Sequence, residues 1–341
     1  MYIVFNTLEE YNSYIQNTDN IKSGNLYIVK DDKMLYFKTN NIDGHLHVYD
    51  YLDEIPPEYI IPTGNIELTE NGNNIDVSAY ATATVNVAGD AHDMMNLIER
   101  DITSLDIPSG TLSIGDNAFY KCSSITSITI PNTVTRIGFE AFRSCTGLAS
   151  VRIPNSVTTM ESYAFNGCTS LTSVTIGNGL RGIGDYAFYY CTQLENLNLG
   201  NGVTRIGESA FQSCRSLPSV NIPDTVTVIG QYAFNACNGL SSVIFGRGVT
   251  TIGQGAFFGC TSLTSIDIPS GVTSIGLNVF NNCSSLSSVT VEAATPPSLG
   301  SGTFDNNASG RKIYVPSQSV AAYKAATIWK NYKDYIEAIP T

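Results

Sequence analysis

The sequence is poor in basic residues, and this shortage excludes one class of partner. It holds 18 Lys and Arg against 30 Asp and Glu, which gives a formal net charge of −12. Sixteen of the acidic residues but only five of the basic ones fall within residues 1–100, so the acidity belongs to the N-terminal region. Because affinity for nucleic acid comes mainly from clustered Lys and Arg on phosphates, we expect no nucleic-acid partner.

Long apolar runs and a secretion signal are also missing. No stretch approaches the 18 consecutive apolar residues of a membrane-spanning helix, although 43% of the residues are hydrophobic. The segment that starts at Met1 lacks a basic stretch, an apolar run and a small-residue cleavage site. We therefore expect a folded protein that is made in a cytoplasm and does not contact a membrane.

Histidine is scarce, which limits catalysis and metal binding. The three histidines are His45, His47 and His92. His45 and His47 could hold a metal from one strand face, but no cysteine lies nearby, and a structural or solvated role is the better interpretation. Catalysis needs converging acids, bases or nucleophiles, and a glycan-cleaving enzyme needs paired carboxylates facing a groove. The repeated part of the sequence offers neither, so we predict a protein that is not an enzyme and has no cofactor or metal.

Cysteine, in contrast, is abundant and regularly spaced. A phenylalanine stands three residues before each cysteine, and before it an alanine that is replaced once, by Val279. A constant period between 20 and 29 residues is typical of a leucine-rich-repeat solenoid. The eight cysteines follow one another at intervals of 23 residues: Cys122, Cys145, Cys168, Cys191, Cys214, Cys237, Cys260 and Cys283.

Each repeat reads as one coil of a solenoid. In the unit 171–193, the opening Leu-x-x-Val-x-Ile alternates as a strand with one buried face does. A turn rich in Pro, Asn, Asp and Gly follows, and then a glycine that recurs in most coils, replaced once by Glu161, for which we predict a tight corner. The Ala-Phe-x-x-Cys run predicts a single helical or 3₁₀ turn on the convex side. The expectation is one strand per coil.

Stacking such coils at about 4.8 Å brings like residues into register. The Phe and Cys positions then form two interior ladders. Nine strands can be counted between 105–107 and 289–291, and 312–315 predicts a tenth after an irregular coil that contains Phe304. Cysteines of neighbouring coils would lie within the Cα range of a disulfide, about 4.4–6.8 Å. Because their side chains run in parallel and the expected compartment is reducing, we favour free, buried thiols that act as apolar fillers.

The unit resembles the BspA-like (Treponema-type) leucine-rich repeat over roughly residues 97–341. The segment 294–341 is similar to the ending of such arrays, and its apolar positions Val320, Tyr323, Ile328 and Trp329 predict an amphipathic helix that caps the last coil. We therefore predict a leucine-rich-repeat solenoid over 97–293, an irregular last coil and helical cap over 294–341, and small β-rich modules before them.

Residues 1–60 and 61–96 do not follow the period. The segments 25–30 and 33–38 predict a hairpin, and residues 24–31 resemble the Gly-x-Leu-Tyr-Ile-Val-x-Asp pattern of N-terminal attachment modules in bacteriophage fibre proteins. Residues 61–96 resemble a short β module of phage tail and fibre proteins. For residues 1–60 the plainer alternative is a small independent β-rich domain.

The phage resemblance implies a virion fibre or decoration protein. It would attach to other virion proteins through residues 1–60, assemble as a trimer or other homo-oligomer, and present the solenoid to a host surface glycan or protein. The alternative is a leucine-rich-repeat adhesin of the bacterial cell surface.

Two surfaces are candidates for ligand binding. One is an aromatic row five residues before the cysteines, Tyr163, Tyr186 and Tyr232, joined by Tyr120, Tyr189, Tyr190 and Phe258. Tyrosine suits protein or glycan recognition, although these tyrosines could equally just cover the convex edge. The other is the exposed strand position, which varies from coil to coil: Thr129, Arg152, Thr175, Asn198, Asn221, Ile244 and Asp267.

Overall fold

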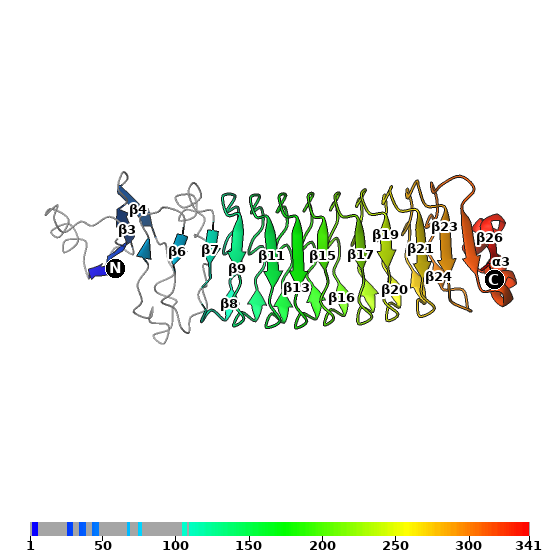
Figure 1. The fold of residues 1–341 in the computed structure, drawn as a ribbon, viewed down its shortest axis with the longest axis horizontal. Helices are drawn as coiled ribbons and strands as arrows, with labels where there is room; N and C mark the ends of the chain where they lie inside the picture. Colours follow the sequence, from blue (N-terminus) through cyan, green and yellow to red (C-terminus); the bar gives the residue numbers. More distant parts are fainter. Residues whose placement is uncertain are drawn as a thin grey trace.

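The structure, a computed structural model, describes residues 109–340 and Ile107, together with seven strands within residues 1–106. From residue 104 onward, successive coils stack along one long axis (Figure 1). No helix of the described residues is long and apolar enough to cross a membrane.

Each coil contributes one longer strand to a common surface, which we call the strand face. The strands pair in parallel, and partners lie 23 residues apart, as Val151 does with Val174, except for the last pair, in which Val289 lies opposite Ile313. The nine predicted strands and the tenth are confirmed. They are β7 Ser104–Asp106, β9 Ser127–Thr129, β11 Ser150–Ile153, β13 Ser173–Ile176, β15 Asn196–Asn198, β17 Ser219–Asn221, β19 Ser242–Ile244, β21 Ser265–Ile268, β23 Ser288–Val291 and β25 Lys312–Val315.

A second, two-residue strand in each coil was not predicted. These strands also pair in parallel, as Ile137 does with Ile114 on one side and Met160 on the other. The prediction of one strand per coil was therefore incomplete, because two residues are too few to show an alternating pattern. The short strands are β8 Ser113–Ile114, β10 Arg136–Ile137, β12 Thr159–Met160, β14 Gly182–Ile183, β16 Arg205–Ile206, β18 Val228–Ile229, β20 Thr251–Ile252, β22 Ser274–Ile275 and β24 Ser298–Leu299.

The Ala-Phe-x-x-Cys run forms successive turns instead of the predicted helical or 3₁₀ turn. Three of its five amides close turns within the coil, as the Cys122 amide does on the Phe119 carbonyl at 3.2 Å. The alternate amides leave the coil, and that of Phe119 donates to the Ala141 carbonyl of the next coil at 2.7 Å. This edge of the solenoid, which we call the turn edge, is therefore hydrogen-bonded between coils much as a sheet is.

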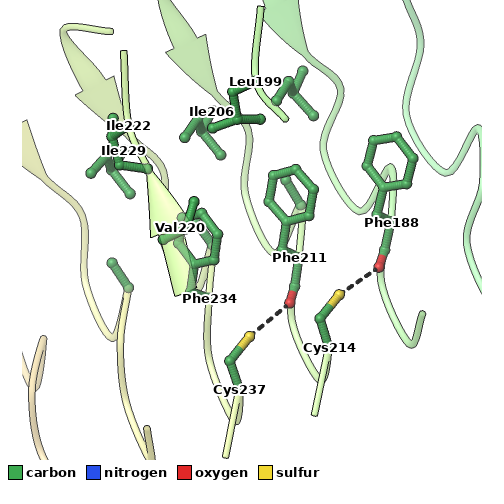
Figure 2. Packing of buried hydrophobic residues seen from close by; sticks show 14 of the residues in the cluster. Phe188, Leu199, Ile206, Phe211, Cys214, Val220, Ile222, Ile229, Phe234 and Cys237 are labelled. Atoms are coloured by element: carbon green, nitrogen blue, oxygen red, sulfur yellow. Dashed lines mark hydrogen bonds between the residues drawn. The ribbon is translucent and has the colours of Figure 1, made fainter. Parts of the chain in front are cut away.

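The predicted phenylalanine ladder is confirmed. Nine rings from Phe119 to Phe304 stack one on the next, and the Phe211 ring centroid lies 5.3 Å from that of Phe188 and 5.2 Å from that of Phe234. All are buried except Phe119, which is partly covered. Each coil thus supplies one ring that fills the space between its two neighbours (Figure 2).

The cysteine ladder is also confirmed, and its thiols are free and buried. They do more than fill space, because each thiol from Cys145 onward donates to the carbonyl of the phenylalanine in the preceding coil. The Sγ to oxygen distance is 3.4 Å from Cys214 to Phe188 and 3.1 Å from Cys237 to Phe211 (Figure 2). Burial raises the pKa of the Cys237 thiol to about 12, so the thiol stays protonated and remains a donor.

The recurring glycine allows the backbones of neighbouring coils to approach closely. A Cβ on Gly230 would lie 2.6 Å from the carbonyl carbon of Gly207, and one on Gly184 would lie 2.4 Å from the carbonyl oxygen of Glu161. Neither glycine has a positive φ. The predicted tight corner is therefore better described as a close contact between coils.

The C-terminal cap closes the last coil, as predicted. Its elements are the 3₁₀ helix η2 Ser317–Ser319, the helix α3 Val320–Ala325, the 3₁₀ helix η3 Trp329–Tyr335 and the strand β26 Ile336–Ala338. Tyr323 and Trp329 are fully buried and donate to carbonyls of the last coil at 2.7 and 2.8 Å. The helix is shorter than expected, and β26 adds a strand parallel to β25 that was not predicted.

Four strands near the N-terminus form a sheet in the order β1-β2-β3-β4: β1 Tyr2–Phe5, β2 Leu26–Val29, β3 Met34–Lys38 and β4 Asp43–His47. β2 and β3 are antiparallel, with Leu26 opposite Phe37, which confirms the predicted hairpin. β5 Glu67–Leu68 pairs with β6 Asn74–Asp76, which itself pairs in parallel with β7. Residues 1–60 and 61–96 otherwise lie outside the described residues, as do the side chains of His45 and His47 and the whole of His92.

Candidate binding surfaces

The variable strand residues form one row along the strand face, which we call the middle-strand row. Arg152 lies opposite Thr175, which lies opposite Asn198. Neighbouring strand residues point inward, so that Val151 and Val174 are buried while Arg152 is exposed. The row runs through Thr129, Arg152, Thr175, Asn198, Asn221, Ile244 and Asp267.

A second row lies two residues before the middle-strand row on the same face. Its members are exposed or half-buried and, except for Asn196, all are serine. The prediction missed this serine row, although the same residue type at the same place in successive coils was a visible signal. It consists of Ser127, Ser150, Ser173, Asn196, Ser219, Ser242, Ser265 and Ser288.

The two rows differ in what they present to solvent. Short hydroxyls make the serine row uniform, whereas the middle-strand row carries a cation at Arg152, a carboxylate at Asp267 and an isoleucine, Ile244, that is 62% exposed. Arg152 and Asp267 lie five coils apart, which corresponds to about 24 Å at the usual strand spacing. A ligand that contacts both must therefore be extended.

The tyrosines of the aromatic row lie at the turn edge, but only two of them meet. The rings of Tyr163 and Tyr186 stack with centroids 4.8 Å apart and planes 3° apart. Ser209 occupies this position in the next coil, so Tyr232 stands apart from them, and its hydroxyl accepts a hydrogen bond from Gln254 at 2.6 Å. The structure thus splits the predicted row into a stacked pair and a single residue.

One hydroxyl of the pair is already hydrogen-bonded. Tyr186 Oη donates to Glu208 at 2.8 Å, and this bond, followed by partial burial, raises the pKa of Tyr186. The phenol is therefore neutral at physiological pH. Tyr189 contacts Tyr186 at 5.8 Å between ring centroids, and Tyr190 contacts Tyr189 at 5.0 Å, so two of the additional tyrosines do extend the pair.

The tyrosine positions carry an unusual backbone conformation. Tyr163, Tyr186 and Tyr232 have φ angles of 62°, 58° and 55°. This left-handed region favours Gly and Asn, which occupy the same position in later coils as Gly255 and Asn278. A bulky residue there costs about 1 kcal/mol relative to an unstrained conformation, so the fold itself does not require tyrosine.

Metal chemistry finds little support in the described part of the chain. Among these described residues, no group of three or more His, Cys, Asp or Glu side chains could hold an ion. The prominent side chains of the strand face and the turn edge are hydroxyls, amides, rings and isolated charges. Such groups suit recognition by surface contact.

The chain matches a known family over most of the solenoid. The BspA type leucine rich repeat region matches residues 98–218 and 204–327. No curated protein matches the chain.

Solved structures of bacterial proteins are similar to it. A leucine-rich-repeat protein of Treponema pallidum is 30% identical over 56% of this chain and 86% of its own, with a TM-score of 0.45. A leucine rich cell surface protein of Faecalibacterium prausnitzii is 22% identical over 81% and 96%, with a TM-score of 0.34, and a leucine-rich-repeat protein of Bacteroides ovatus is 22% identical over 81% and 98%, with a TM-score of 0.31. Because the family match covers more than half of the chain, this protein belongs to the BspA-type leucine-rich-repeat family.

Proposed function

We propose that the protein is a bacterial surface adhesin that binds a host surface glycan or protein through the strand face of its solenoid. The observation that carries this proposal is the contrast between buried and exposed positions of the same strands. The buried positions repeat Val, Ile and Leu, whereas the middle-strand row changes from Thr to Arg, Asn, Ile and Asp.

Folding alone does not account for this variety. The serine row lies on the same strands, meets the same solvent and is nearly uniform. If the middle-strand row only covered the sheet, short hydroxyls would suffice there as well. Arg152, Ile244 and Asp267 instead offer a charge, an apolar surface and an opposite charge in sequence along one line, which is what an extended ligand needs for specific contact.

Serine substitutions in the middle-strand row test the proposal. The variant Arg152→Ser, Asn198→Ser, Asn221→Ser and Asp267→Ser makes this row resemble the serine row and leaves the buried residues intact. Binding of the labelled protein to host epithelial cells and to immobilised mucin, measured by flow cytometry and biolayer interferometry, should fall at least tenfold.

A matched control changes the surface beside the short strands. Thr204→Ser, Thr227→Ser, Thr250→Ser and Thr273→Ser alter four exposed threonines beside the short strands and keep their hydroxyls, which donate to the preceding coil. This control should bind like the wild type. Unchanged binding of the middle-strand variant would contradict the proposal.

A second candidate function is a virion fibre or decoration protein, and the hairpin of β2 and β3 favours it. This hairpin contains the Leu-Tyr-Ile-Val segment of the pattern that resembles phage attachment modules. In this function residues 1–60 would bind other virion proteins, and the chain would assemble as a trimer or other homo-oligomer. A strict monomer in mass photometry would count against it.

Localisation separates the two candidates. Antibody labelling of intact bacteria, with loss of label after brief protease treatment of the cells, supports the adhesin. Labelling of purified phage particles supports the virion protein. The nucleotide sequence upstream of the Met1 codon gives an independent answer, because an in-frame signal peptide favours the adhesin and neighbouring capsid or tail genes favour the virion protein.

A further inference from the structure

We propose that five aromatic side chains at the turn edge form a docking ridge for a polypeptide whose apolar residues are flanked by carboxylates. The aromatic ridge consists of Phe139, Tyr163, Tyr186, Tyr189 and Tyr190. The inference rests on the proposed binding function and adds to it a second surface and the chemical class of its partner.

The ridge is continuous from ring to ring. Phe139 meets Tyr163 edge-on at 5.7 Å between centroids, Tyr163 stacks on Tyr186 at 4.8 Å, and Tyr189 and Tyr190 continue the contacts at 5.8 and 5.0 Å. The two ends are the most open, because Phe139 is 40% and Tyr190 41% exposed. The three tyrosines between them are half-buried. A contiguous group of solvent-accessible rings of this kind favours an interaction site.

The backbone beneath the ridge indicates that these rings do not serve the fold. Tyr163, Tyr186 and Tyr190 have φ angles of 62°, 58° and 63°. Other coils place residues suited to this conformation there, such as Asn278 and Asn282. The same conformation recurs in other coils with residues such as Ser209 and Ala236, so the backbone does not select a bulky ring at these positions.

The packing of the rings favours a polypeptide over a sugar. Tyr163 and Tyr186 lie parallel within 3°, so each covers one face of the other. A sugar ring packs flat on an open aromatic face, and the two facing sides of this stacked pair are closed to it. Apolar side chains pack well against ring edges, and Tyr is among the residue types that dominate protein interfaces.

Cations stand at both ends of the ridge. Arg143 lies 5.9 Å from the Tyr163 ring, and Lys121 lies 5.1 Å from the Tyr120 ring in the coil that precedes the coil of Phe139. At the other end Arg215 lies 5.9 Å from the Tyr190 ring. Arg143 is paired with Glu140. Within the described part of the chain, Lys121 and Arg215 have no carboxylate at salt-bridge distance. A partner with a carboxylate on each side of its apolar residues complements this arrangement.

The test compares peptide selection on matched variants. A random dodecapeptide library displayed on phage is selected on the wild type, on the ridge variant Tyr163→Asn, Tyr186→Asn and Tyr190→Asn, and on the control Tyr232→Asn. The control makes the same substitution at the same backbone position in a coil outside the ridge. The ridge variant should keep its thermal midpoint, because Asn suits the left-handed conformation.

Peptides enriched on the wild type and on the control, at least tenfold over the ridge variant, should carry clustered apolar residues with Asp or Glu on both sides. Lys121→Glu with Arg215→Glu should weaken a selected peptide at least tenfold, and added salt should weaken it on the wild type. Equal enrichment on the ridge variant, no enriched peptide, or enriched peptides without acidic flanks would overturn the proposal. So would an oligosaccharide on a glycan array that binds the wild type but not the ridge variant.

The serine variant of the middle-strand row separates this proposal from the one on which it rests. It should keep the ridge peptide, and the ridge variant should keep binding to host cells through the strand face. If one of the two surfaces does not bind its ligand, the test of the other surface can therefore still be interpreted.

Discussion

Two stacks of aromatic rings follow the same coils, one inside the solenoid and one at its surface. The buried pair Phe165 and Phe188 has centroids 5.3 Å apart and planes 2° apart, and the surface pair Tyr163 and Tyr186 has nearly the same geometry, at 4.8 Å and 3°. The buried stack continues through every coil from Phe119 to Phe304, whereas the surface position also holds Glu140, Ser209 and a glycine.

The difference shows that stacking alone does not reveal whether a ring is needed for folding. Rings at equivalent positions of neighbouring coils stack because the repeat places them one strand spacing apart. The buried position requires a large apolar ring in each coil, while the surface position tolerates almost any residue and suits Gly and Asn best. A ring inside is therefore needed for folding, and a ring outside needs another explanation.

Alkaline pH should lower the stability of the core in which the buried stack lies, and this is the largest effect that we expect. Burial raises the pKa of Cys168 and Cys237 to about 12, from a usual value of 9.0, and also raises the pKa values of Cys191 and Cys214. Above pH 9 the unfolded chain loses thiol protons that the folded chain retains, so stability is complete below pH 9 and falls as the pH rises toward 12. Each such thiol removes about 1.4 kcal/mol per pH unit in this window.

Urea unfolding followed by circular dichroism between pH 7 and 11, with a reducing agent present, measures this loss. The double variant Cys168→Ala and Cys237→Ala should show a shallower decline above pH 9 than the wild type. A urea midpoint that stays level through pH 11 would show that the thiols are not buried in solution.

Substitutions within one coil compare the two stacks directly. Phe188→Ala should lower the free energy of unfolding by about 3–5 kcal/mol, because it leaves a cavity between two rings that cannot close over it. Tyr186→Asn, two residues earlier, should leave it unchanged or slightly raised. Similar losses in the two variants, measured by chemical unfolding, would refute the distinction between the stacks.

The end of the buried stack offers a finer test. Phe304 has no following coil, and its amide donates to the Tyr332 hydroxyl of the cap at 3.3 Å. Tyr332→Phe leaves this buried amide without an acceptor and should cost about 1–3 kcal/mol. Tyr335→Phe keeps the ring beneath Arg311 and is the matched control, so equal stability of the two variants would speak against a capping role for the hydroxyl.

The smallest effect concerns the backbone at the turn edge. Ala236 has a φ of 56°, and Gly259 holds the same position in the next coil with a φ of 72°. A Cβ at Gly259 would come no closer than 3.9 Å to a neighbouring atom, so no clash complicates the comparison. Ala236→Gly should stabilise and Gly259→Ala destabilise by about 1 kcal/mol each. Thermal unfolding showing the reverse order would mean that these positions are not left-handed in solution.

The sequence revealed what the period repeats. Phenylalanine, cysteine and the alternating strand residues recur in coil after coil, so the long strands, both ladders and the exposed row could be predicted. The short strands were not predicted because two residues, such as Arg136 and Ile137, are too few to show alternation. The left-handed positions were not predicted because Tyr163 and Tyr186 are not residue types that favour this conformation. Gly255 and Asn278, which occupy the equivalent position in later coils, did indicate it.

The candidate surfaces were predicted less completely than the fold. The register of the strands follows from the period, so the middle-strand row could be placed. The aromatic contacts at the turn edge depend on which side chains lie in neighbouring coils. The prediction grouped Tyr232 with Tyr163 and Tyr186, although Ser209 occupies this position in the coil between Tyr186 and Tyr232. Likewise, the bond from each cysteine thiol to a phenylalanine carbonyl depends on side-chain direction, which the spacing does not encode.

The hydrogen bonds between coils point in two directions, and this gives the solenoid an order of assembly. The phenylalanine amides from Phe119 to Phe280 donate forward to the coil that follows, and the cysteine thiols from Cys145 onward donate back to the coil before. As the chain leaves the ribosome, the thiol of each new coil donates to a carbonyl of the coil that is already folded. The new coil also supplies the carbonyl to which the phenylalanine amide of the preceding coil donates. The growing end therefore always has amides without an acceptor, among them that of its last phenylalanine, and the Tyr332 hydroxyl of the cap accepts from the last phenylalanine amide of the array.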